Sequence, residues 1–150
     1  MATYFEPARE IPVREEVDVL VVGGGPSGIM AAYAAAKDKN LKVMLIESRG
    51  YLGGNLTIGL PILAFLGPKG NQVIKGEAQK FIDRLKARDA ASDHKRCANH
   101  MSLTIINSEE AKNVAFEMME EAGVKVLMYV FCSAAIIKDG KVGGVVIETK

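Results

Sequence analysis

Val17–Gly28 reads VDVLVVGGGPSG, an apolar segment followed by closely spaced glycines. Its apolar segment, Val19 to Val22, is long enough for a strand and too short for a helix. Glycines then interrupt the chain, and the sequence from Ile29, IMAAYAAAK, is rich in strong helix formers. A strand, a glycine-rich turn and a helix in this order favour an α/β fold with a parallel sheet.

Three glycines of this stretch, Gly23, Gly25 and Gly28, fit the pattern G-x-G-x-x-G. In dinucleotide-binding proteins the first permits the tight turn, the second lets a pyrophosphate approach the backbone, and the third lets the helix pack close to the strand. The free N–H groups of the first helical turn also attract an anion, and a proline fits there. An ordinary glycine-rich turn is the alternative. The predicted phosphate loop consists of Gly23, Gly24, Gly25, Pro26, Ser27 and Gly28.

A carboxylate follows at the distance that such a site requires. The sequence KVMLIE, residues 42–47, is an apolar strand that ends in an acid, and Glu47 lies 22 residues after Gly25. Dinucleotide sites place an acid about 20 residues after the glycines, where it accepts hydrogen bonds from a ribose. A solvated acid at a strand end is the alternative. Strand, glycines, helix, strand and acid in this register favour nucleotide binding.

A second glycine pair follows the acid in ESRGYLGG, Glu47–Gly54. This E-x5-G-G arrangement resembles the flavoprotein oxidoreductases of the glutathione reductase type, in which it wraps the far side of the FAD pyrophosphate and the ribityl chain. A plain NAD-binding domain has no need of this second loop. LGGNLTIGLP, residues 52–61, is similar to the bacterial family called FAD-dependent oxidoreductases, and the resemblance runs from about Ile11 to the end of the chain.

The resemblance implies FAD as the cofactor, held by the phosphate loop and by a second group of residues. That group comprises Glu47, Ser48, Arg49, Gly53, Gly54, Asn55 and Cys132. Cys132 is expected at the end of the third parallel strand, where the backbone of related flavoproteins hydrogen-bonds the adenine; its side chain can equally be a small buried hydrophobe. Arg49 is expected near the adenosine ribose or as a solvated charge, although a cation there could also meet a 2′-phosphate, as in NADP-binding proteins.

His94, Cys97 and His100 are spaced HxxCxxH, which could supply three metal ligands. No fourth ligand is near and no paired cysteine motif occurs, so we prefer loop residues with hydrogen-bonding roles and expect no metal. By resemblance, a similar Cys and His lie in a segment that folds toward the flavin. His100 is therefore the candidate for a substrate contact or proton carrier, since histidine titrates near neutrality; a purely structural histidine is the alternative.

The remaining pattern completes a Rossmann-like fold. We expect strands over 17–22, 41–47 and 124–131, and helices over 27–39, 74–88 and from an N-cap at Ser108 to Gly123. Residues 48–71 are expected to be a glycine-rich loop with a short helical turn near 58–66, and residues 89–107 a long irregular loop. Asp139-Gly140 predicts a hairpin, which by resemblance begins the meander of a Rossmann-like FAD-binding fold.

The length of the chain limits the number of domains. The chain of 150 residues can bury one core, so we expect a single domain with an irregular arm over 1–16. By resemblance, residues 1–150 are the N-terminal part of one FAD-binding domain, and the rest of that fold and the substrate domain are missing. We therefore expect a fragment or a truncated gene product.

Charge and cysteine usage bear on partners and location. The net charge of +1 gives no electrostatic pull toward nucleic acid or an anionic membrane, so we expect neither as a partner. The N-terminus lacks the apolar segment of a secretory signal, and two widely separated cysteines without a Cys-x-x-Cys motif fit the cytoplasm. The sequence does not indicate an oligomeric state.

The leading hypothesis is an FAD-dependent oxidoreductase in which the flavin exchanges a hydride or an electron pair with a small organic substrate. A nicotinamide-dependent dehydrogenase is the second hypothesis, because the first glycine motif is shared with that class. A truncated nucleotide-binding module, inactive alone, is the third. No residue pattern names the substrate.

Overall fold

The computed structural model describes residues 1–149 and contains a three-stranded parallel sheet. The sheet consists of β1 (Val19–Val22), β2 (Val43–Ile46) and β6 (Lys125–Leu127), in the order β1-β2-β6. All residues of the central strand β2 are buried, because a parallel strand is covered on both faces. The predicted parallel sheet is confirmed, but its third strand is shorter than the range 124–131, since the chain leaves the sheet after Leu127.

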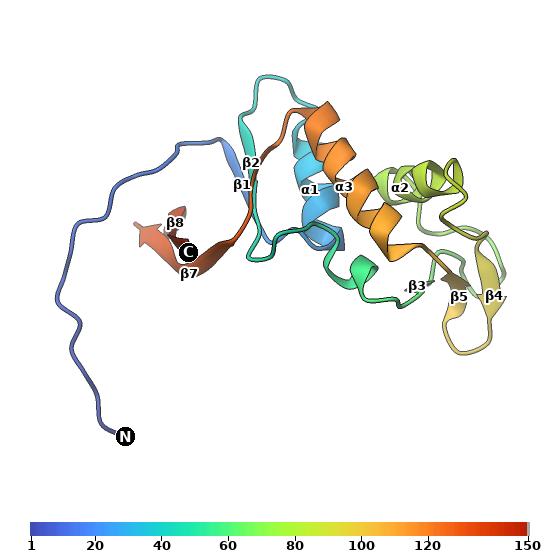
Figure 1. Ribbon diagram of the computed structural model, residues 1–150, viewed down its shortest axis with the longest axis horizontal. Helices are drawn as coiled ribbons and strands as arrows, with labels where there is room; N and C mark the ends of the chain where they lie inside the picture. The colour runs from blue at the N-terminus through green and yellow to red at the C-terminus, as the bar shows by residue number, and fades with distance from the viewer. Residues whose placement is uncertain (150) are drawn as a thin grey trace.

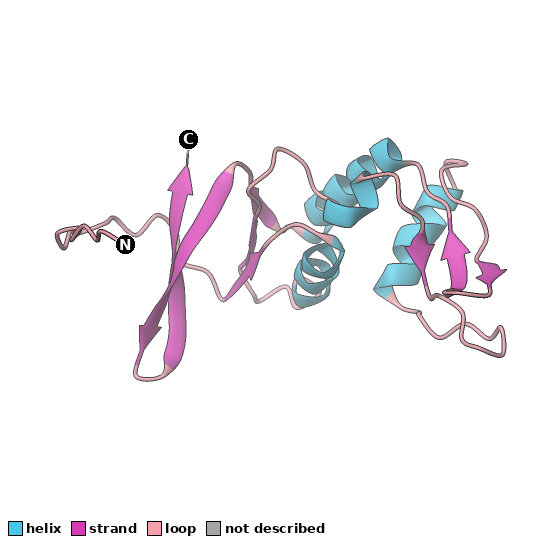
Figure 2. Ribbon diagram, turned by 90° about the horizontal axis from the view of Figure 1, so that it is seen from below, coloured by secondary structure: helices cyan, strands magenta, loops and turns pink. Residues whose placement is uncertain are grey.

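Three helices lie between this sheet and a second one (Figures 1 and 2). They are α1 (Pro26–Ala35), α2 (Glu77–Lys86) and α3 (Ser108–Ala122). All three were predicted, with ends that differ by a few residues. Asn107, and not Ser108, caps α3: its side-chain oxygen accepts from the N–H groups of Glu109 at 2.9 Å and Glu110 at 3.2 Å. Gly123 ends the helix in a left-handed conformation, as predicted.

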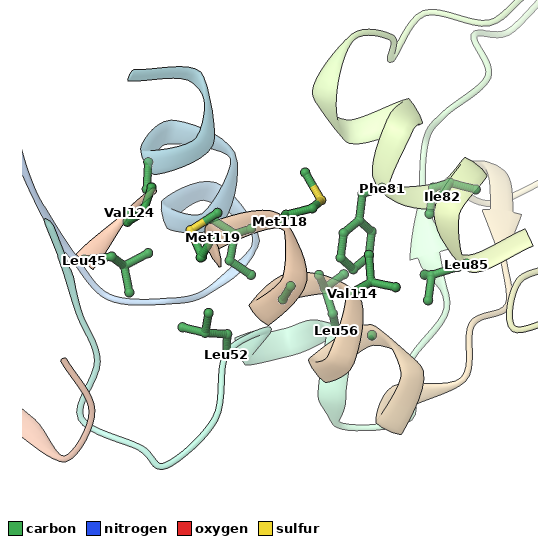
Figure 3. Packing of buried hydrophobic residues seen from close by; sticks show 14 of the residues in the cluster. Leu45, Leu52, Leu56, Phe81, Ile82, Leu85, Val114, Met118, Met119 and Val124 are labelled. Atoms are coloured by element: carbon green, nitrogen blue, oxygen red, sulfur yellow. The ribbon is translucent and has the colours of Figure 1, made fainter. Parts of the chain in front are cut away.

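One hydrophobic core joins the helices to both sheets (Figure 3). Phe81, Ile82 and Leu85 of α2 are buried, because their spacing places them on one face of the helix. Met118 and Met119 of α3 are also buried in the core. Each such side chain contributes on the order of 1.5–3 kcal/mol by leaving water.

The second sheet corrects two predictions. Its strands β3 (Ile62–Leu63), β5 (Met101–Thr104) and β4 (Lys95–Cys97) pair antiparallel in the order β3-β5-β4. Residues 89–107 are therefore not a long irregular loop, and the short helix in the preceding glycine-rich segment is a 3-10 turn over Gly54–Thr57 instead of a turn near 58–66. These strands are too short for an alternation of apolar and polar residues to be recognised in the sequence. In addition, two of the buried positions, Ser102 and Thr104, carry polar side chains.

A hairpin covers the other face of the parallel sheet. Strands β7 (Val130–Lys138) and β8 (Lys141–Thr149) are joined at Asp139-Gly140, as predicted. The base of the hairpin packs through Val130 against Met44 and Ile46 of β2. Residues 1–16 form an extended arm that leaves the body of the protein (Figure 1). Within residues 1–149, no helix combines the length and the apolar character needed to cross a membrane.

Candidate nucleotide-binding site

The first glycine loop links β1 to α1 in a geometry that side chains would prevent. Gly23 turns the chain with φ of +99°, a conformation that glycine adopts without strain. A Cβ on Gly28 would lie 1.9 Å from the carbonyl oxygen of Gly23, so the helix can approach the turn only because this residue has no side chain. The structure therefore agrees with the roles predicted for these glycines, the tight turn at Gly23 and the close packing of the helix at Gly28.

The N-terminus of α1 opens toward free space. A Cβ on Gly25 would have no atom within 4 Å, so this backbone is accessible to a bound group. Pro26 occupies the first turn, as predicted, and no side chain caps the helix. The N–H groups of Ser27 and Gly28 belong to the first turn, where an α-helix supplies no intrahelical acceptor. This end of α1 therefore has the donors and the positive dipole end that suit a phosphate.

The Glu47 carboxylate lies beside this loop, at the end of β2. Its Oε2 accepts from the Gly24 N–H at 2.6 Å, and its Oε1 accepts from the Arg49 N–H at 2.8 Å and from the Ser48 hydroxyl at 3.0 Å. Partial burial raises the pKa of Glu47, but these hydrogen bonds outweigh burial and hold the pKa below its ordinary value. The side chain is thus an anion at neutral pH that can accept from hydroxyl groups.

The second glycine pair meets the first loop directly. The Gly53 N–H donates to the carbonyl oxygen of Gly24 at 2.8 Å, and a Cβ on Gly54 would lie 2.9 Å from the Cα of Gly25. Leu52 is buried beneath the loops, whereas Asn55 is exposed at the start of the 3-10 turn. Two segments far apart in sequence therefore meet at the N-terminus of α1, where the backbone of Gly25 faces open space.

Positive charge borders the site at Arg49. Its side chain donates to the Tyr51 hydroxyl at 3.2 Å and lies 5.7 Å from the centre of that ring. The Lys112 ammonium of α3 lies 4.9 Å from the same ring. The contacts with Tyr51 hold the Arg49 side chain beside the turn that follows Glu47.

Cys132 does not lie at the end of the third parallel strand. That strand ends at Leu127, and Cys132 lies on β7, where it pairs with Ile147 of β8. The difference arises at Tyr129, whose left-handed backbone with φ of +57° ends β6 and starts the hairpin. The side chain is partly buried against the parallel sheet, as expected of a small hydrophobe. The adenine contact of its backbone stays a prediction.

The HxxCxxH pattern lies along the edge of the second sheet, with His94 just before β4, Cys97 at its end and His100 in the turn that follows. Nδ1 of His94 is 2.7 Å from the Thr104 hydroxyl and Nε2 is 2.9 Å from Oε1 of Gln79, and the ring stacks on Phe65. Burial lowers the pKa of His94. His94 therefore has the hydrogen-bonding role that we preferred, and residues 1–149 contain no cluster of three His, Cys, Asp or Glu side chains able to hold a metal.

His100 is exposed in the turn between β4 and β5. This sheet lies on the far side of the helices from the parallel sheet (Figure 1). The structure thus brings together the two glycine loops, Glu47 and Arg49, and leaves His100 outside that group. Its role toward a substrate stays a prediction.

Two residues beside the site were missed from the sequence. Gly50 follows Arg49 in the turn after β2, and the Tyr129 ring lies so close that a Cβ on Gly50 would be 2.0 Å from its hydroxyl oxygen. The glycine within E-x5-G-G could have indicated that another group packs against the backbone at this position. No local pattern identifies Tyr129 as the residue that does so.

The chain belongs to the family of FAD dependent oxidoreductases, whose match covers residues 18–150. FAD is the family's cofactor, and the two glycine loops with Glu47 fit its adenosine and pyrophosphate groups. The predicted cofactor and the Rossmann-like fold are therefore confirmed.

Among its relatives, thiamine thiazole synthase 1 of Vitis vinifera is 28% identical over 95% of this chain and 41% of its own length. The thiamine thiazole synthase of Thermococcus kodakarensis is 28% identical over 89% of this chain and 47% of its own length. The crystal structure of THI4 from Thermovibrio ammonificans has a TM-score of 0.60 at 23% identity, over 89% of this chain and 48% of that one. This likeness shows the fold, and the chain spans less than half the length of each of these proteins.

Proposed function

We propose that this chain provides the adenosine- and pyrophosphate-binding part of a flavin-dependent oxidoreductase that acts on a small organic molecule. The observation that carries the proposal is the contact between the two glycine loops at the N-terminus of α1, with the Glu47 carboxylate beside them. In this arrangement the N–H groups of the first turn of α1 bind the pyrophosphate, and Glu47 accepts from the ribose hydroxyls. FAD supplies the redox chemistry when bound.

The proposal is tested by titrating the purified protein with FAD, followed by flavin fluorescence and by absorbance near 450 nm, roughly where flavins absorb. We expect saturable, non-covalent binding that ADP competes for, because ADP carries the same adenosine and pyrophosphate. Binding of NAD with no binding of FAD would refute the proposal. Gly25→Val is the matched variant: its backbone is open, so the protein should fold normally by circular dichroism and fail to retain FAD.

Thiamine thiazole formation is a narrower candidate for the reaction. It is favoured by the match to thiamine thiazole synthases, which reaches 95% of this chain. Mass spectrometry of small molecules that co-purify with the protein separates the two candidates. A bound thiazole would favour the narrower function, and flavin without any thiazole would favour a different oxidoreductase reaction.

A further inference from the structure

An exposed aromatic residue lies against the turn that carries Glu47. Tyr129 stands in the short connection between β6 and β7, with 62% of its surface exposed and φ of +57°. Large side chains seldom adopt this left-handed conformation, which persists only where neighbouring contacts fix the backbone. Contacts with neighbouring segments therefore hold Tyr129 in this conformation.

Backbone hydrogen bonds join this connection to the turn after β2. The Glu47 N–H donates to the carbonyl oxygen of Leu127 at 2.9 Å, and the Val130 N–H donates to that of Glu47 at 2.9 Å. The Tyr129 N–H donates to the carbonyl oxygen of Arg49 at 3.3 Å. The backbone on both sides of the Tyr129 ring is thus tied to the residue that bears the carboxylate.

The ring itself rests on the backbone of Gly50. A Cβ at that position would lie 2.0 Å from the Tyr129 hydroxyl oxygen, 2.4 Å from Cζ and 2.9 Å from Cε1. Gly50 ends the turn whose Arg49 N–H and Ser48 hydroxyl donate to Oε1 of Glu47. The ring therefore limits the movement of the groups that orient the carboxylate.

We propose that Tyr129 is a positioning residue: its ring packs on Gly50 and holds the turn 48–50, so that Glu47 keeps the orientation in which it binds the ribose. This inference rests on the proposed function, in which Glu47 accepts from the ribose of FAD. The ring carries the effect, because the Tyr129 hydroxyl makes no hydrogen bond within residues 1–149. Phenylalanine can therefore replace tyrosine.

The test measures ADP binding by calorimetry, because ADP contains the ribose and the pyrophosphate without the flavin. We expect Tyr129→Ala to weaken ADP binding about tenfold and Tyr129→Phe by less than about twofold. In a Glu47→Gln background, Tyr129→Ala should add less than about twofold, because a residue that acts through the carboxylate loses its effect when the carboxylate is gone. An equal tenfold loss in both backgrounds, or no loss in either, would overturn the proposal.

Gly50→Ala provides the second variant, should Tyr129→Ala not fold. The added methyl displaces the ring, so it should weaken ADP binding to a similar degree, and Tyr129→Ala added to it should cause no further loss. Gly50→Ala with unchanged ADP affinity would overturn the proposal. If wild-type protein binds neither ADP nor FAD, the proposed function fails as well; normal wild-type binding with unaffected variants overturns the positioning role alone.

Discussion

Replacing Gly28 by alanine separates the structural glycine of the first loop from the ligand-facing one. The new Cβ would lie 1.9 Å from the Gly23 carbonyl oxygen and 3.0 Å from its carbonyl carbon. Both atoms belong to the backbone of a tight turn, so neither can rotate away as a side chain would. Relief requires α1 to move from the strand, which breaks the packing of Ile29 and Ala32 in the core.

The magnitude follows from two opposing effects. Overpacking of this kind costs about 1–3 kcal/mol, and a clash with backbone belongs at the upper end. Alanine in place of glycine inside a helix returns about 1 kcal/mol. We expect Gly28→Ala to lower the free energy of unfolding by about 2 kcal/mol, which corresponds to a melting temperature about 4–8 °C lower for a chain of this size.

The assay is thermal and urea unfolding of the ligand-free protein, followed by far-ultraviolet circular dichroism, with Gly25→Ala as the matched control. A Cβ on Gly25 meets no atom within 4 Å and the residue has φ of −74°, so we expect a stability change within about 1 kcal/mol. A Gly28→Ala protein as stable as wild type, or a Gly25→Ala protein equally destabilised, would refute this assignment of roles.

Three further predictions concern charge and the sheet edge. Glu47→Ala should weaken FAD binding by about 1.5–3 kcal/mol, the range for hydrogen bonds to a charged group. An unchanged affinity in the titration would show that the carboxylate does not contribute to FAD binding. Burial lowers the pKa of His94 in the folded state, so the unfolded chain binds more protons than the folded one near pH 6.5. The free energy of unfolding should therefore fall as the pH drops through that value. A His94→Gln protein whose urea unfolding depends on pH as the wild type's does would contradict this. Within residues 1–149, β1 pairs with β2 alone, so its free edge should promote association, and a monomer at every concentration in size-exclusion chromatography would oppose that expectation.

Most of the parallel half of the fold could be predicted because its signals are local. The strand before Gly23, the glycine turn and the helix after Pro26 each depend on neighbouring residues, and the acid at Glu47 lies at a fixed spacing. The hairpin at Asp139-Gly140 is local in the same sense. These are the elements in which pattern and structure agree.

The parts that could not be predicted depend on distant contacts. β3 spans Ile62–Leu63 and exists because it pairs with β5, about 40 residues later. Ser102 is polar yet fully buried, since its hydroxyl accepts from the Leu66 N–H at 2.9 Å. The end of β6 is set at Tyr129 by hydrogen bonds to the turn after β2. No window of sequence around these residues contains the partner that decides their structure.

The position of α3 has a consequence for the order in which the protein opens. Its buried face meets α1 and the 3-10 turn near the glycine loops. On its outer face, Glu121 pairs with Arg84 of α2 and Glu117 pairs with Arg88 in the turn that follows α2. Val114 and Met118 of this helix are fully buried in the core that it shares with α1 and α2. The backbone amides at the centre of α3 should therefore exchange with deuterium last, at the rate of global unfolding, while those of the hairpin tip exchange by local fluctuation.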